Sequence, residues 1–79
     1  MSVKNDIVSL RKKAGLSVYE LSKRCGFISN GHVLSQHVKK AEAGHQVKIE
    51  TALKIYRELK KAGVCENFED VFWLSDDAE

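Results

Sequence analysis

The chain has 79 residues, of which 43% are hydrophobic, and it contains no proline, five glycines and a formal net charge of +2. A chain of this length buries only about 60% of its unfolded surface, which predicts one domain without a second lobe to form an enzyme cleft. All 13 lysines and arginines lie in residues 1–64 with 5 of the 11 acids, so this part carries +8, whereas residues 65–79 hold 6 acids and no base. A basic body suits a polyanionic partner, although an ordinary solvated surface gives the same totals.

A first helix is predicted near the start of the chain. Its signals are a residue that can cap it, three apolar residues at helical spacing and a glycine that ends it: Asn5; Ile7, Leu10 and Ala14; Gly15. The basic run at residues 11–13 falls in its last turn, where cations interact favourably with the helix dipole.

A second and a third helix are predicted between residues 16 and 44. Ser17 and Glu20 have the spacing of a capping box, so the second helix begins near Val18 and ends at Gly26. After turn residues at 29–31, a third helix ending at Gly44 is indicated by apolar residues at i, i+4 and i+7: Leu34, Val38 and Ala41. Its opposite face carries donors and cations but no acid: Ser35, Gln36, Lys39, Lys40 and Ala43, with His32 one turn earlier.

Two further helices are predicted in the last third of the chain. The fourth ends at Gly63 and is expected to turn one apolar face to the core: Ile49, Ala52, Leu53, Tyr56 and Leu59. Asn67 and Asp70 are spaced to cap a short fifth helix, Phe68 to Leu74. No strand pattern extends beyond a few residues, so the predicted fold is all-α with five helices in a single domain, residues 1–74, followed by a flexible acidic tail, residues 75–79.

Three sequence runs follow one another along the chain: Ile7-x-x-Leu10-Arg11-Lys12-Lys13-Ala14-Gly15-Leu16-Ser17-x-x-Glu20-Leu21-Ser22, then Glu42-x-Gly44, then Ile49-Glu50-Thr51-Ala52-Leu53-Lys54-Ile55. From about Asp6 to Leu74 the chain resembles the Cro and phage-repressor type of helix-turn-helix regulator, which has the lambda-repressor-like fold. It departs from that pattern in two places. Ile28 to Val33 stands as an insertion before the recognition helix, and Val18 stands where relatives commonly carry a glutamine that contacts a phosphate.

The resemblance implies that the third helix enters the major groove of double-stranded DNA. Glutamine, lysine and serine are common readers of base edges, which makes Ser35, Gln36 and Lys39 the candidate readers. Asn30 and His32 in the inserted segment are the alternative readers. Contacts to the DNA backbone are expected from six residues: Ser17, Tyr19, Lys40, His45, Gln46 and Lys48. The competing interpretation is that these side chains form a solvated helix face.

Two structural expectations accompany this interpretation. Members of the resembled family place an arginine and a glutamate at the positions of Arg11 and Glu42, so an ion pair is predicted there. Phe68, Phe72 and Trp73 are the expected anchors of a homodimer, because three large aromatics in six residues exceed what a short helix can bury in its own domain. The alternative is that all three cover the core.

The predicted function is therefore sequence-specific DNA binding by a transcriptional repressor of phage or mobile-element type, which recognises a two-fold symmetric operator as a dimer. One alternative is the antitoxin of a toxin–antitoxin pair that regulates its own promoter. A toxin or an antirepressor protein is a candidate additional partner. Another is a protein-interaction module. No catalytic residues, metal site or cofactor are predicted, since His32 and His37 lie about 500° apart around a helix and Cys25 stands at an apolar position. Without a signal peptide or an apolar run of about 20 residues, a cytoplasmic protein without membrane contact is expected.

Overall fold

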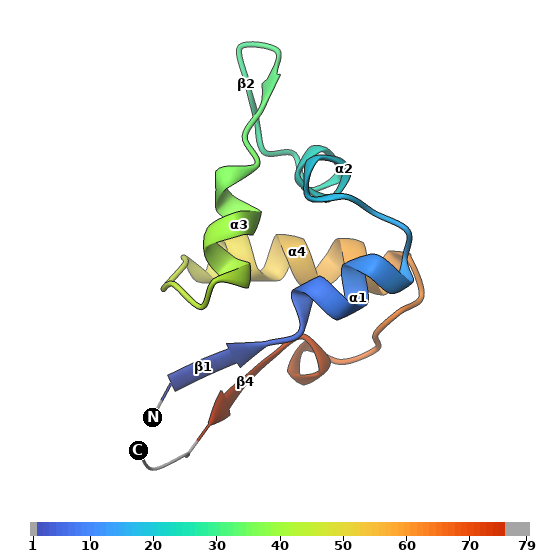
Figure 1. Cartoon of the computed structure of the whole chain (residues 1–79), viewed down its shortest axis with the longest axis vertical. Helices are drawn as coiled ribbons and strands as arrows, with labels where there is room; N and C mark the ends of the chain where they lie inside the picture. Colours follow the sequence, from blue (N-terminus) through green and yellow to red (C-terminus); the bar gives the residue numbers. More distant parts are fainter. Residues whose placement is uncertain (1, 76–79) are drawn as a thin grey trace.

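In the computed structural model, which describes residues 2–75, helices surround a small core and two short ribbons extend from it (Figure 1). The elements follow in this order: β1 (Ser2–Asn5), α1 (Ile7–Lys13), α2 (Val18–Arg24), β2 (Ile28–Ser29), β3 (His32–Val33), α3 (Gln36–Glu42), α4 (Ile49–Lys61), a 3-10 turn η1 (Phe68–Asp70) and β4 (Phe72–Ser75). The helices within this described part lack the length and apolar character needed to cross a membrane.

The prediction of an all-α fold with five helices is wrong. Residues 2–75 form four α-helices and two antiparallel sheets of two strands each, which makes this a small mixed α/β domain. One sheet pairs β1 with β4, and the other pairs β2 with β3. The first sheet joins the two ends of the described chain, and the second is a hairpin between α2 and α3 (Figure 1).

Local signals place the four helices close to their predicted positions. The capping box of α2 is present, because Ser17 Oγ accepts the Glu20 N–H at 3.0 Å and Glu20 Oε1 accepts the Ser17 N–H at 3.4 Å. Asn5 lies one residue before the actual cap position of α1, where its Oδ1 accepts the Ile7 N–H at 3.2 Å. The end of α3 needs a glycine, since Gly44 has a φ of 87° in the left-handed region.

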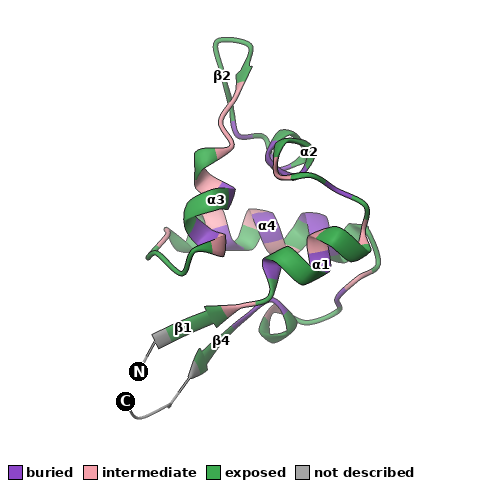
Figure 2. Ribbon diagram, viewed as in Figure 1, coloured by how far each residue is buried: buried purple, intermediate pink, exposed green. Residues whose placement is uncertain are grey.

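The core is formed by buried residues of α1, α2, α3 and α4 together with Phe27, Val71 and Phe72, and the buried stretches of the helices lie on the sides that face one another (Figure 2). The predicted core face of α4 is rotated from the actual one. Ile49 is 67% exposed and Leu53 49%, whereas Ile55 and Leu59 are fully buried and Ala52 nearly so. At about 100° per residue, the buried stripe is centred on Ile55, which the predicted face omitted. Ile49 and Leu53 therefore form an apolar strip on the outside of α4.

The predicted fifth helix, Phe68 to Leu74, is wrong as well. Only Phe68–Asp70 is helical, as a single 3-10 turn, and the chain then becomes β4, which pairs with β1 in the register Asn5 to Phe72 and Val3 to Leu74. The Asp70 carboxylate accepts the Asn67 N–H at 3.0 Å and the Glu66 N–H at 3.1 Å, and these hydrogen bonds lower the pKa of Asp70. This turn directs the chain back along β1.

The strand also separates the three aromatic side chains. Successive side chains of a strand point to opposite faces, so Phe72 is buried at 6% exposure while Trp73 is 41% exposed. Phe68 is half-buried, with its ring stacked on Phe72 at a centroid distance of 5.3 Å and edge-on to Tyr56 at 5.6 Å. Two of the three predicted dimer anchors are thus packed within the domain, and Trp73 remains at the surface.

Ser22 of α2 is fully buried, and its hydroxyl has no hydrogen-bond partner among the described residues. We expect Ser22→Ala to raise the free energy of unfolding by about 1 kcal/mol, because burying an unsatisfied hydroxyl is costly. Urea denaturation measures the change. Ser9→Ala is the matched control, since Ser9 lies exposed in α1 and shares only the gain in helix propensity. A lower urea midpoint for Ser22→Ala than for the wild type would contradict the expectation.

Candidate nucleic-acid interface

The exposed side of α3 carries the residues predicted to read bases. Val38 is 0% and Ala41 2% exposed, so they hold the opposite side of the helix against the core. Gln36 and Lys39 consequently face solvent, while Ser35 is half-buried at the cap position of the helix. The outward side also includes Lys40 and Ala43 and contains no acid.

An ion pair fixes the other end of α3. Arg11 Nε lies 2.8 Å from Glu42 Oε2, and both side chains are only 13% exposed. Arg11 Nη1 also donates a hydrogen bond to the Leu16 carbonyl at 3.2 Å. This is the arginine–glutamate pair expected between the first and third helices, and it ties α3 to α1 and to the chain that leads into α2. Asn5 adds a second tie, because its Nδ2 donates to the Ala41 carbonyl at 2.9 Å.

The predicted backbone contacts lie on either side of α3. His45, Gln46 and Lys48 are exposed in the loop that follows α3, and Lys48 is the residue that precedes α4. Tyr19 is 57% exposed on α2. Ser17 differs from the others, because its hydroxyl and its N–H are both engaged in the capping box, which leaves its side chain less able to bind a phosphate.

Charge is distributed unevenly over the chain. Residues 21–41 contain no aspartate or glutamate, and they hold four lysines and arginines: Lys23, Arg24, Lys39 and Lys40. This stretch covers most of α2, the hairpin and most of α3, which together form the upper end of the molecule (Figure 1). Between Glu20 and Glu42 the chain therefore offers four cations and no acid to a polyanion.

The inserted segment is a β-hairpin, with Ile28 opposite Val33 and Ser29 opposite His32. Asn30 and His32 both lie exposed near its tip, immediately before α3. The sequence analysis named Asn30 and His32 as candidate readers but did not include Ser29, which lies opposite His32. A hairpin was indicated by the sequence, because Asn30-Gly31 is a dipeptide that favours a two-residue hairpin turn and the flanking residues alternate between apolar and polar.

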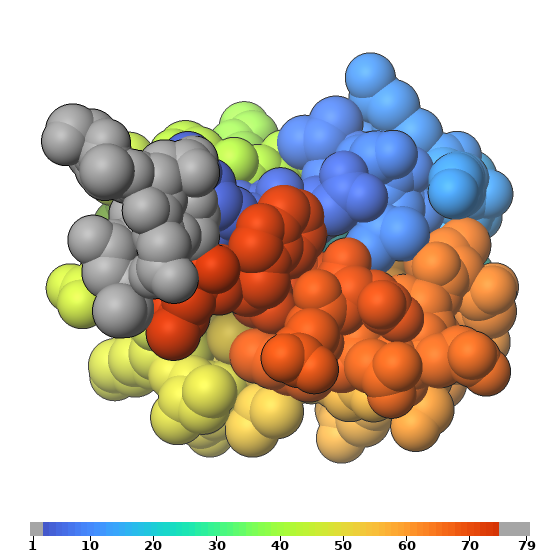
Figure 3. All heavy atoms as spheres, turned by 90° about the horizontal axis from the view of Figure 1, so that it is seen from below, coloured from blue at the N-terminus to red at the C-terminus, as the bar shows by residue number. Residues whose placement is uncertain are grey.

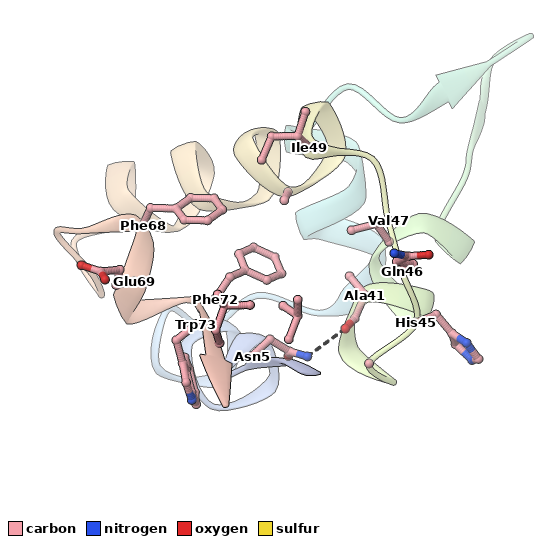
Figure 4. A pocket seen from close by; sticks show the side chains of 14 residues that line it. Asn5, Ala41, His45, Gln46, Val47, Ile49, Phe68, Glu69, Phe72 and Trp73 are labelled. Atoms are coloured by element: carbon pink, nitrogen blue, oxygen red, sulfur yellow. Dashed lines mark hydrogen bonds between the residues drawn. The ribbon is translucent and has the colours of Figure 1, made fainter. Parts of the chain in front are cut away.

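A groove of about 630 Å³ lies next to the C-terminal end of α3, between the β1–β4 sheet, the loop after α3 and the start of α4, and His45 and Gln46 are among its lining residues. Phe72 points into it, Ile49 and Val47 line its far wall, and Trp73 lies at its rim (Figure 4). Seen from below, η1 and β4 (orange-red and red) lie between the N-terminal residues in blue and the start of α4 in yellow (Figure 3). Four apolar side chains along this groove are exposed to solvent: Val3 (52%), Ile49 (67%), Trp73 (41%) and Leu74 (63%).

Cys25 and His37 are packed against other side chains in the described part of the chain. Cys25 is buried at 3% exposure, and burial together with the nearby Glu58 carboxylate raises the pKa of its thiol to about 12. A thiol in this state stays protonated at neutral pH and is a poor nucleophile. No cluster of three or more potential metal ligands occurs among the described residues. His37 instead packs its ring against Phe27, with a centroid distance of 4.8 Å.

No family model, curated protein or solved structure matches the chain. The resemblance to helix-turn-helix repressors therefore stays a prediction from the three sequence runs between Ile7 and Ile55.

Proposed function

We propose that this protein binds double-stranded DNA in a sequence-dependent manner through α3 and acts as a transcriptional repressor of the Cro type. The observation that carries the proposal is the acid-free stretch at residues 21–41, whose outward side on α3 combines Gln36 with Lys39 and Lys40. A helix with such a face fits the major groove, where glutamine can pair with adenine and lysine with guanine or a phosphate.

The burial pattern supports a fixed orientation of this helix. Val38 and Ala41 in the core and the Arg11–Glu42 pair at the C-terminal end determine which side of α3 faces outward. Specificity needs such rigidity, because base contacts depend on side chains held in register by contacts to the backbone. Tyr19, Lys48 and the loop residues His45 and Gln46 would supply those sequence-independent contacts.

Selection of bound sequences from a random DNA pool tests the proposal directly. The expected result is an enriched site with two-fold symmetry, and a mobility shift on that site that resists competitor DNA. An interaction module with a basic face would enrich no sequence, and its weak binding would disappear with competitor, which would contradict the proposal. If the enriched sequence also occurs upstream of the protein's own coding sequence, that match would support autoregulation, a property shared by repressors and antitoxins.

We further propose that two copies associate through the groove and its exposed apolar rim. An isologous contact needs a surface that is complementary to itself, and this one offers both a hollow and apolar side chains beside it. The β1–β4 sheet also has only two strands among the described residues, and a two-stranded sheet can be extended by pairing at an outer edge. A dimer of this kind would present two α3 helices, one to each half of a two-fold symmetric operator.

Trp73→Ala should weaken this dimer by about 30-fold, because large aromatic side chains at an interface commonly contribute about 2 kcal/mol or more. Sedimentation equilibrium over a range of concentrations measures the effect. Val8→Ala is the control, since Val8 is 38% exposed on α1 and does not line the groove. A wild-type monomer at high micromolar concentration, or unchanged operator binding by Trp73→Ala, would refute the dimer.

A further inference from the structure

The β2–β3 hairpin is firmly attached to the helix that it precedes. The Leu34 N–H donates to the Phe27 carbonyl at 2.7 Å, which closes the base of the hairpin just before α3. The Phe27 ring packs against His37 of α3, and Lys54 Nζ of α4 lies 5.7 Å from the centre of the same ring. The hairpin and α3 are therefore joined at a packed base and should move as one unit.

The tip of the hairpin has a defined shape. Asn30 and Gly31 have φ values of 51° and 79°, and positive φ at both central residues is the geometry of a two-residue turn that suits the twist of a hairpin. Ser29 and His32 are cross-strand partners, so their side chains share one face of the ribbon, and Ile28 and Val33 share the other. The tip thus presents a hydroxyl, an amide and an imidazole with fixed relative positions.

This ribbon contributes little to the core. Ile28 is 48% exposed, and Ser29, Asn30, Gly31 and His32 are all exposed. The hairpin projects beyond the helices at one end of the molecule (Figure 1). Its neighbours in sequence are the cations Lys23 and Arg24 on one side and Lys39 and Lys40 on the other, which favours an anionic partner such as DNA over a basic or neutral protein surface.

We propose that the hairpin is a second DNA-reading element that continues the reading surface of α3 along the major groove, with Ser29, Asn30 and His32 as its contact residues. This inference rests on the proposed function. A two-stranded ribbon fits the major groove, and serine, asparagine and imidazole groups can donate to or accept from base edges. Three residues of extended ribbon reach about 10 Å, or about 3 base pairs beyond those that Gln36 contacts.

The test compares two variants in the same selection from a random DNA pool. Ser29→Ala combined with His32→Ala removes the shared polar face and keeps the Asn30-Gly31 turn. We expect it to lose preference at about 3 outer base pairs of each half-site and to bind the wild-type site about 5-fold or more weakly. Gln36→Ala should lose preference at a different, inner base pair. Ser9→Ala, an exposed change on α1, should leave every position unchanged.

The outcomes separate this inference from the proposed function. If the wild type enriches no sequence, the proposed function fails and the inference fails with it. If Gln36→Ala flattens one position and the hairpin variant binds like the wild type, α3 reads DNA and the hairpin inference is wrong. A hairpin variant that binds all sequences equally more weakly would show backbone contact only and would also overturn it. Circular dichroism and a urea midpoint equal to the wild type establish that the variant is folded.

Discussion

Replacing Glu42 with alanine should lower the free energy of unfolding by about 3–5 kcal/mol, because Arg11 would be left largely buried without its counter-ion. Both side chains are only 13% exposed, and the Nε–Oε2 distance of 2.8 Å is that of a charge-assisted hydrogen bond. Native domains have total stabilities of about 5–15 kcal/mol, so this loss is a substantial part of the free energy of unfolding. Urea denaturation followed by circular dichroism measures the change.

A matched control distinguishes the loss of a buried, paired carboxylate from the loss of an exposed one. Glu50→Ala removes a carboxylate that is 73% exposed and lies 4.0 Å from Lys54, and it should cost no more than about 0.5 kcal/mol. Arg11→Met combined with Glu42→Leu should recover much of the stability that Glu42→Ala removes, because an apolar pair leaves no buried charge. If Glu42→Ala unfolds at the same urea concentration as Glu50→Ala, the pair is not structural.

Gln36→Ala should reduce affinity for the selected operator by about 1–3 kcal/mol and affect random DNA much less, since a base contact matters only at the matched base pair. The reason is positional: Gln36 begins α3 and is exposed, opposite the side that Val38 and Ala41 bury. Competition binding against the operator and against a scrambled duplex measures both changes in affinity. Equal reductions on the two duplexes would mean that α3 is not docked in this orientation.

The only other glutamine in the chain supplies the control. Gln46 lies exposed in the loop after α3, where a contact to the DNA backbone is expected, so Gln46→Ala should weaken binding to all sequences alike. Because Gln46 also lines the groove, sedimentation equilibrium must first show that this variant dimerises like the wild type. Lys48→Ala should likewise weaken binding to all sequences, and it should reduce the slope of log affinity against log salt by about 0.9 for each phosphate that the lysine no longer neutralises. If either loop variant loses affinity for the operator but not for the scrambled duplex, the loop reads bases.

Much of the helical part and of the candidate interface could be predicted because the signals are local. The capping box at Ser17 and Glu20 and the glycine after α3 act within one helical turn of the backbone that they stabilise. The outward position of Gln36 followed from the helical spacing of Val38 and Ala41, which needs no knowledge of the partner elements. The Asn30-Gly31 turn was also local, and the hairpin was missed because its strands have only two residues each.

The tertiary structure had to supply the rest. Strand β4 pairs with β1 across almost the whole chain, and a run such as Val71-Phe72-Trp73-Leu74 can form a helix or a strand until a partner edge is available. That pairing decided that Phe72 is buried while Trp73 is exposed, because side chains alternate along a strand. The rotation of α4, which buries Ile55 and exposes Ile49, depended likewise on where the neighbouring helices pack. Sequence periodicity shows which residues are apolar and lie on one face, but packing against other elements decides which of them are buried in the core.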